Sequence, residues 1–258
     1  MTDTFTFIDG TTVPRIGFGA MRLTGQPGNF GPYRDPDAGI ALIRRAHDLG
    51  VRLFDGALAY GPHHADRLLG EALSGREALI ASKAGVEKAG PTGADITRDA
   101  RPETLRRHVE ETLRDLGAER ISLYYLHWPG RDVPLAESVG ALQRAREEGK
   151  IGMVGVSNVD LSQLEEALGT GPIGAVQNRW DDESPGDRAV LEQTGRKGIA
   201  FVPYGPLGAN PMKPGAPLAE GGTGAALRAL LDLAPNVLPI PGTTSPEHLE
   251  ENWAALAR

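Results

Sequence analysis

Eight short apolar runs alternate along this chain with longer amphipathic stretches, and this alternation constrains the fold more than any other feature. Several runs are apolar almost without interruption, as in parallel strands that are covered on both faces. Alternating strands and helices favour an α/β architecture, and eight of each can close a (β/α)8 or TIM barrel. The expected strands are residues 16–21, 51–57, 78–84, 121–128, 151–157, 175–178, 199–204 and 237–240.

Helix-start signals lie in three of the amphipathic stretches. Pro102 suits the first position of a helix, where its missing N–H has no partner to lose. Asp160 and Gln163 have the spacing of a capping box, and Ser245 precedes a proline and apolar residues at helical intervals. We therefore expect a helix to begin at each of these three places.

The N-terminal segment predicts a β-hairpin. Residues 5–8 and 11–13 have strand-forming composition and flank Asp9 and Gly10, a dipeptide typical of tight hairpin turns. Because this hairpin precedes the first barrel strand, we expect it to cap the bottom of the barrel. We further expect residues 1–258 to form a single domain, and the Gly- and Pro-rich residues 205–224 to form a long loop that can act as a lid.

The overall charge argues against nucleic acid or a membrane as a partner. The chain has a net charge of −7 and a pI near 5.4, whereas phosphate-rich partners require basic patches. It contains no cysteine, which excludes disulfides and thiolate sites, and no histidine or carboxylate pair has the spacing of a zinc motif, so no metal is expected. With no recognisable signal peptide or membrane span, we expect a cytoplasmic protein, either a monomer or a homo-oligomer.

Four polar side chains stand at or just after the ends of three successive predicted strands. Asp55 closes the second apolar run, and Tyr60 follows it. Lys83 ends the third run, and His127 ends the fourth. In a (β/α)8 barrel the active site forms at the carboxyl ends of the strands, so we expect these side chains to converge there.

The four groups together fit the reduction of a carbonyl, which needs hydride at carbon and a proton at oxygen. A free tyrosine has a pKa of about 10 and gives up its proton reluctantly unless a nearby cation stabilises the phenolate. Lys83 can supply that cation, and Asp55 can hold Lys83 charged and oriented. His127 can donate a hydrogen bond that places the substrate oxygen. Tyr60 is then the predicted proton donor.

Other interpretations compete with this one. Each residue taken alone is more often a structural ion pair, a loop anchor or a core residue, and only their joint occurrence favours a site. Lys83 can also serve a lyase or isomerase as a Schiff-base nucleophile. Asp55 argues against that role, because a nearby carboxylate keeps lysine protonated. Besides the reductase and the Schiff-base enzyme, the chain can be a non-catalytic, nucleotide-binding regulatory subunit.

A series of short motifs runs along the chain around and beyond these residues. They are Phe54-Asp55 with Tyr60-Gly61, Ser82-Lys83, Leu126-His127-Trp128-Pro129, Gly155-Val156-Ser157-Asn158, Val176-Gln177-Asn178, Tyr204-Gly205-Pro206-Leu207, Ile240-Pro241-Gly242-Thr243-Thr244 and Glu251-Asn252. In this order the motifs strongly resemble the aldo-keto reductase family over essentially the whole chain. The resemblance implies an oxidoreductase with a small-molecule carbonyl substrate, and it makes the four polar residues the catalytic tetrad, with Tyr60 as general acid.

The resemblance also implies which residues bind a nicotinamide cofactor. Ser157, Asn158 and Gln177 would hold the carboxamide, because an amide needs both donors and acceptors. Tyr204 would stack beneath the nicotinamide ring. The remaining cofactor contacts implied are Pro206, Leu207, Gly208, Thr243, Thr244, His248, Glu251 and Asn252.

The chain departs from the family where a ribose 2′-phosphate would bind. Many members have a lysine after the Ile-Pro pair and an arginine further along, whereas this chain has Gly242 and His248. His248 can still contact a phosphate when protonated, at the start of the expected last helix. NADPH is therefore the expected cofactor, with NADH as the alternative.

A narrower resemblance concerns the substrate. Phe30-Gly31-Pro32, Tyr60-Gly61-Pro62-His63, and Gly242-Thr243-Thr244 with His248-Leu249 look like bacterial pyridoxal-reductase-type members. The chain stops at Arg258, without the extended tail that many relatives fold over the substrate, so an open pocket is expected. The residues expected to line it are Met21, Phe30, Trp128 and Trp180.

Overall fold

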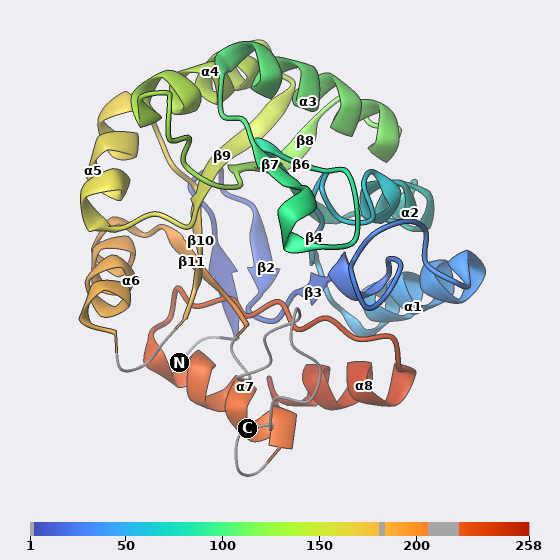
Figure 1. Cartoon of the computed structure of the whole chain (residues 1–258). Coiled ribbons are helices and arrows are strands. Elements are labelled where there is room, and N and C mark those ends of the chain that lie inside the picture. Colours follow the sequence, from blue (N-terminus) through green and yellow to red (C-terminus); the bar gives the residue numbers. More distant parts are fainter. Residues whose placement is uncertain (1–2, 181–183, 206–221, 258) are drawn as a thin grey trace.

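Parallel strands form the centre of the molecule. The computed structural model describes residues 3–180, 184–205 and 222–257. Within these ranges, the main sheet has seven parallel strands, hydrogen-bonded in the order in which they follow one another along the chain, and it curls into a barrel (Figure 1). The strands are β3 (Phe18–Gly19), β4 (Leu53–Asp55), β5 (Leu79–Ala84), β8 (Ile121–Leu126), β9 (Ile151–Ser157), β10 (Ala175–Arg179) and β11 (Ala200–Tyr204).

Helices surround the sheet on its outer side (Figure 1). The three predicted starts are confirmed: Pro102 is the first residue of α3, and the side chains of Asp160 and Ser245 cap α5 and α8. No helix in the described ranges is long and apolar enough to cross a membrane. The helices are α1 (Pro36–Leu49), α2 (His64–Leu73), α3 (Pro102–Leu116), α4 (Leu135–Glu147), α5 (Leu161–Thr170), α6 (Pro185–Lys197), α7 (Gly222–Leu233) and α8 (Pro246–Ala254).

An irregular segment closes the barrel between β11 and β3. The Leu238 amide donates to the carbonyl oxygen of Phe201 at 2.9 Å, and the Gly17 amide donates to that of Pro239 at 3.0 Å. The prediction of a regular strand over residues 237–240 is wrong, because Pro239 and Pro241 have no N–H with which to continue a ladder. The segment nevertheless occupies the place of the eighth strand, as the barrel prediction requires.

The first barrel strand is also shorter than predicted. Of residues 16–21, only β3 (Phe18–Gly19) is regular, and the chain then turns into the short helix η1 (Ala20–Arg22). A Cβ atom at Gly19 would lie 2.7 Å from the carbonyl oxygen of Ile240. Glycine is therefore required here so that β3 can approach the irregular closing segment.

The N-terminal hairpin caps the bottom of the barrel, as predicted. Strand β1 (Thr4–Thr6) pairs antiparallel with β2 (Thr12–Pro14). The turn is wider than the predicted two-residue Asp-Gly turn, because the Phe7 amide already bonds the Thr11 carbonyl oxygen at 2.8 Å and only residues 8–10 lie outside that bond. Phe7 and Val13 are buried against the residues that begin the inner face of the barrel strands, Leu53, Leu79 and Leu123.

A second hairpin extends from the carboxyl end of β5. Strands β6 (Val86–Lys88) and β7 (Ile96–Arg98) pair antiparallel, and the short helix η2 (Gly93–Asp95) lies between them. In Figure 1 this hairpin lies in front of the barrel, over the ends of the strands. The sequence pattern did not predict it, because its strands are short and β7 is exposed on every residue.

Close packing of α2 against α3 generates a prediction about two glycines. A Cβ atom at Gly70 would lie 2.4 Å from the carbonyl oxygen of Leu116, which is backbone and cannot easily move, whereas a Cβ at Gly169 in α5 would meet nothing within 4 Å. We expect Gly70→Ala to lower the free energy of unfolding by about 1–3 kcal/mol. Gly169→Ala should instead raise it by about 0.5–1 kcal/mol, because alanine favours the helix.

Urea unfolding of the two variants and the parent measures both changes. Gly70→Ala and Gly169→Ala are the same chemical change on a helix and differ only in the space around the new methyl group. A Gly70→Ala protein as stable as Gly169→Ala would contradict the packing of α2 on α3 described above.

Candidate active site

The pleat of the strands brings the candidate side chains to one end of the barrel interior. Side chains alternate between the two faces of a strand, and Leu53, Ala81 and Tyr125 belong to the inner cluster. Asp55, Lys83 and His127 each follow one of these by two residues and so continue the same inner face. The same spacing applies in the other half of the barrel to Ser157, Gln177 and Tyr204.

Lys83 is the centre of the candidate site. Its side chain is buried, and its Nζ atom lies 2.6 Å from Asp55 Oδ2, 2.6 Å from the Gly56 carbonyl oxygen and 3.3 Å from Tyr60 Oη. These contacts use all three donors of an ammonium group. The other Asp55 oxygen accepts a hydrogen bond from Gln177 Nε2 at 2.9 Å. The buried ion pair is therefore fully hydrogen-bonded.

Burial and charge set the protonation of Lys83 and Tyr60. Burial acts to lower the pKa of Lys83, but the charges of Asp55 and Tyr60 and the hydrogen bonds to both together outweigh it, so the pKa is raised and the amine stays charged. Burial raises the pKa of Tyr60, and the Lys83 charge opposes this only in part. The Lys83 charge thus acts to lower the pKa of the phenol, but burial outweighs it and the phenol remains protonated at neutral pH.

His127 faces Tyr60 across the site. The two rings are 6.0 Å apart between centroids and nearly perpendicular, at 82°. Burial lowers the pKa of His127 well below its usual value, and the charges of Lys83 and Arg98 act in the same direction. Its Nδ1 atom is buried and has no hydrogen-bond partner among the described residues. The imidazole is therefore neutral at pH 7.

Asn158, which is expected to hold the cofactor, is bonded to two other expected cofactor residues and to the backbone of His127. Asn158 adopts a left-handed conformation, with φ of 59°, and its Nδ2 atom donates to the His127 carbonyl oxygen at 2.9 Å. Its Oδ1 atom accepts from Tyr204 Oη at 2.5 Å, and its Nδ2 atom also lies 3.0 Å from Ser157 Oγ. Ser157 and Asn158, two of the three residues expected to hold the carboxamide, therefore lie together beside His127.

The residues near the C-terminus that are expected to contact the cofactor differ in their exposure to solvent. Thr243 and Asn252 are buried, and Asn252 Oδ1 has no hydrogen-bond partner among the described residues. The side chains of Thr244, His248 and Glu251 are exposed around α8. The expected contacts Pro206, Leu207 and Gly208 lie outside the described residues, as does most of the expected lid at 205–224.

The four expected pocket residues do not share one environment. Trp128 is half-buried beside His127, with the Arg98 guanidinium 3.8 Å from its ring centroid. Met21 is half-buried in η1, and Phe30 is 37% exposed. Trp180 packs edge-on against Phe201, with centroids 5.7 Å apart, in the core cluster on the outer side of the strands. Trp180 therefore packs as a core residue, away from the inner face that carries the candidate site.

Sequence reasoning missed a buried carboxyl group next to the site. Asp66 in α2 is completely buried; its Oδ2 accepts from Ser82 Oγ at 2.8 Å, and its Oδ1 has no partner among the described residues. Burial raises the pKa of Asp66 to about 7. Its spacing from Leu69 and Leu73, which places the three on one helix face, was the available signal of its burial.

The fold and the site together define a (β/α)8 barrel in which a buried lysine and aspartate contact a partly buried tyrosine at the carboxyl end of the strands. The profile of the Aldo/keto reductase family matches residues 15–213. The chain is 36% identical over 252 residues to an uncharacterized oxidoreductase of Schizosaccharomyces pombe, covering 94% of this chain and 81% of the relative. It is 34% identical over 267 residues to pyridoxine 4-dehydrogenase of Escherichia coli, covering 97% of this chain and 92% of the relative. The chain belongs to the aldo/keto reductase family and is an oxidoreductase.

Solved structures confirm the predicted barrel. A glycerol dehydrogenase from Gluconobacter oxydans superposes with a TM-score of 0.85 over 99% of this chain and 90% of the other, at 24% identity, which shows the shared fold. An aldo-keto reductase from Klebsiella pneumoniae in complex with NADPH superposes with a TM-score of 0.80 at 25% identity. The match covers 100% of this chain and 90% of the other. Within the described ranges there is no cluster of side chains that could hold a metal ion.

The raised pKa of Asp66 makes a prediction about stability and pH. The folded protein keeps this proton up to about pH 7, whereas an aspartate in the unfolded chain releases it near its ordinary pKa of 3.8. Stability from this group is therefore present at low pH and lost as the pH rises through about 7. Asp66→Asn keeps an acceptor for Ser82 and removes the charge, so we expect its free energy of unfolding relative to the parent to rise by about 2–3 kcal/mol between pH 5 and pH 8.

Urea unfolding at several pH values measures the difference. Asp37→Asn in the first turn of α1 removes an exposed carboxylate and is the matched control. If the parent and Asp66→Asn lose or gain stability in parallel across this range, the Asp66 carboxyl does not carry a raised pKa.

Proposed function

We propose that this protein is an NADPH-dependent carbonyl reductase in which Tyr60 donates the proton to the substrate oxygen. The observation that carries the proposal is the position of Lys83 Nζ, 2.6 Å from Asp55 Oδ2 and 3.3 Å from Tyr60 Oη. A phenol beside a charged amine can release its proton as negative charge develops on the substrate, because the cation stabilises the phenolate. Membership of the family supports the reaction class.

The protonation states suit reduction. Burial raises the pKa of Tyr60, so the phenol is protonated at neutral pH and can donate. When bound, NADPH supplies the hydride that the carbonyl carbon accepts. The O–H bond of Tyr60 breaks as the substrate oxygen takes the proton, and the phenolate regains a proton from solvent before the next turnover. His127 is neutral and can donate one hydrogen bond to the same oxygen without carrying a charge.

The donor set fits a nicotinamide cofactor. Ser157, Asn158 and Gln177 present hydroxyl and amide groups, which can both donate to and accept from a carboxamide. At α8, the buried Asn252 Oδ1 has no partner among the described residues, and an amino group of the adenosine half would satisfy it. The Klebsiella pneumoniae reductase, crystallised with NADPH, supports the choice of cofactor.

The relatives direct the first substrate tests. Pyridoxine 4-dehydrogenase of Escherichia coli acts, as its name states, on pyridoxine, and its match covers 97% of the present chain. Trp128 beside His127 can pack against a flat ring. We therefore place aromatic aldehydes, including pyridoxal, first in the panel of substrates.

Tyr60→Phe tests the proton donor directly. We expect kcat for an aromatic aldehyde with NADPH to fall by at least about 100-fold, because the substrate loses its general acid. Tyr124→Phe is the matched control: its hydroxyl is bonded to Thr112 and to the His108 carbonyl oxygen on the outer side of β8, away from the site. That control should retain the parent activity while losing some stability.

Steady-state NADPH oxidation measures both variants, with NADPH binding followed by fluorescence. Unchanged turnover in Tyr60→Phe would remove Tyr60 from the proposed role. Tight NADPH binding by the parent with no turnover over a broad panel of aldehydes and ketones would favour the alternative of a regulatory nucleotide-binding subunit.

Borohydride trapping separates the reductase from a Schiff-base lyase. The Asp55 charge keeps Lys83 protonated, so this amine should not form an imine with an aldehyde. After incubation with an aldehyde and borohydride, peptide mass spectrometry should find no adduct at Lys83. The exposed Lys197 is the internal control that should be modified. An adduct at Lys83 would reverse the assignment.

A further inference from the structure

Arg98 lies beside the candidate site without any role in the chemistry proposed above. It is the last residue of β7, in the hairpin over the carboxyl end of the barrel. Its guanidinium stacks on the ring of Trp128, 3.8 Å from the centroid, and Trp128 is the neighbour of His127. The side chain is also exposed, so a substrate entering from solvent can reach it.

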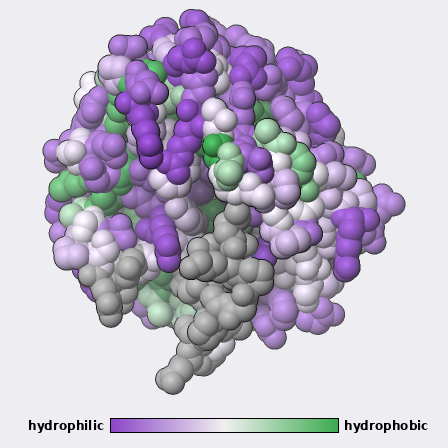
Figure 2. All heavy atoms as spheres, viewed as in Figure 1, coloured by the Kyte–Doolittle hydropathy of each residue, from purple (hydrophilic) through white to green (hydrophobic). Residues whose placement is uncertain are grey.

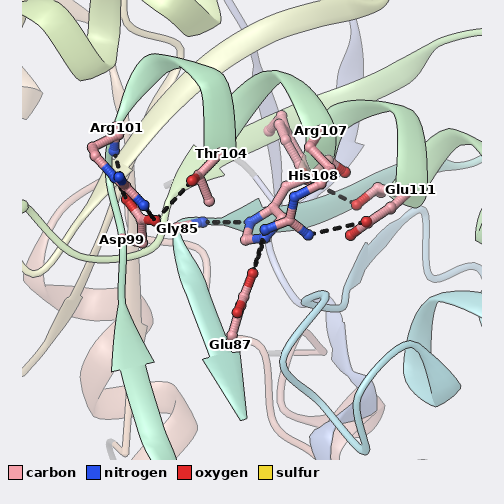
Figure 3. A network of polar contacts seen from close by, with 10 residues as sticks. Gly85, Glu87, Asp99, Arg101, Thr104, Arg107, His108 and Glu111 are labelled. Atoms are coloured by element: carbon pink, nitrogen blue, oxygen red, sulfur yellow. Dashed lines mark hydrogen bonds and ion pairs between the residues drawn. The ribbon is translucent and has the colours of Figure 1, made fainter. Parts of the chain in front are cut away.

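The hairpin that carries Arg98 is anchored to α3 on both strands (Figure 3). Glu87 of β6 contacts His108, whose Nε2 atom lies 3.0 Å away, and it also pairs with Arg107. At the end of β7, Asp99 accepts a hydrogen bond from Thr104 Oγ1 at 2.7 Å. Because both strands are held, Arg98 occupies a defined position before any ligand arrives, which reduces the entropy lost on binding.

Other arginines near this hairpin are paired with carboxylates, and Arg98 differs from them. Arg101 contacts Asp99, and Arg107 contacts Glu87 and Glu111. Among the described residues, the Arg98 guanidinium has no ion pair and no hydrogen bond. In a chain with 34 acidic and 27 basic side chains, carboxylates are abundant, yet none of the described ones neutralises this cation.

The charge of Arg98 reaches the groups around the substrate position. It contributes, after burial and Lys83, to lowering the pKa of His127. It also opposes the rise that burial causes in the pKa of Tyr204. Arg98 is thus electrostatically coupled to both sides of the site, and a negative group bound near His127 and Tyr204 would feel its attraction.

We propose that Arg98 is a specificity-determining residue that binds an anionic group, a carboxylate or a phosphate, on the carbonyl substrate of this enzyme. A guanidinium is planar and offers paired N–H donors that match these groups in a bidentate manner. Stacking on Trp128 holds the guanidinium and leaves its N–H groups without a partner among the described residues. The proposal rests on the carbonyl reductase function above and adds the class of substrate, an aldehyde or ketone that carries a negative charge.

Two pairs of substrates test the proposal with NADPH: benzaldehyde against 4-carboxybenzaldehyde, and pyridoxal against pyridoxal 5′-phosphate. Arg98→Met keeps an apolar side chain over Trp128 and removes the charge. We expect kcat/KM for the preferred anionic substrate to fall roughly 10- to 100-fold, as for the loss of a charge-assisted hydrogen bond, mainly through KM. Values for the neutral partner should stay within about twofold of the parent, and whichever pair shows the effect identifies carboxylate or phosphate.

Three controls keep the result specific. Arg101→Met removes a neighbouring cation that already has a carboxylate partner, and it should leave the preference for the anionic substrate unchanged. Arg98→Lys retains the charge without the planar fork and should recover only part of the loss. The dissociation constant of NADPH, measured by fluorescence, should be the same in Arg98→Met as in the parent.

The outcomes are separable. Equal changes for charged and neutral aldehydes in Arg98→Met, or a weakened NADPH complex in that variant, overturn the proposal because Arg98 would then serve the fold or the cofactor. A parent enzyme that reduces benzaldehyde but shows no preference for either anionic partner also overturns it, while leaving the reductase function intact. A parent that reduces none of the four aldehydes contradicts the reductase function itself.

Discussion

The buried ion pair between Lys83 and Asp55 is the interaction on which the rest of the site depends. Placing two charges inside a protein is costly unless every donor and acceptor is used, and removing one partner of such a pair typically costs about 3–5 kcal/mol. Here β4 and β5 are adjacent and parallel, so their inner faces bring the two side chains to 2.6 Å. Gly56 and Gln177 satisfy the remaining hydrogen bonds, which makes the pair compatible with burial. Tyr60 is then held against a cation that cannot move away.

The same pair links the two halves of the barrel. Gln177 is 122 residues from Asp55 along the chain, yet its amide nitrogen lies 2.9 Å from the carboxylate. Asn158 likewise joins the His127 backbone to the Tyr204 hydroxyl. A ligand that contacts Gln177 or Asn158 therefore acts on groups already bonded to the candidate tetrad. In this arrangement the binding of a carboxamide and the orientation of the acid–base residues are physically coupled.

The sequence predicted those features that follow from the period of the strands. Asp55, Lys83 and His127 end apolar runs, and a parallel barrel must bring such ends together, so the site was predictable without coordinates. The irregular closing segment was not, because its prolines interrupt a pattern that otherwise reads as a strand. The β6–β7 hairpin and the position of Arg98 depend on contacts with α3 and Trp128, which no local pattern encodes. Asp66 was predictable only in part: its helical spacing from Leu69 and Leu73 is a signal of burial, but nothing in the sequence indicates its hydrogen bond with Ser82.

The distribution of charge separates the chemistry of this site from its selectivity. Figure 2 shows hydrophilic side chains predominating along the upper edge of this face, over α3 and α4, and the chain as a whole is acidic. Lys83 is matched by Asp55, so the pair adds little net field at a distance, whereas Arg98 has no such partner among the described residues. Arg98 therefore adds positive charge to the site from the hairpin, outside the barrel strands, alongside that of Arg179 at the end of β10. A change in the hairpin can alter which substrates bind while the buried ion pair, and with it Tyr60, stays in place.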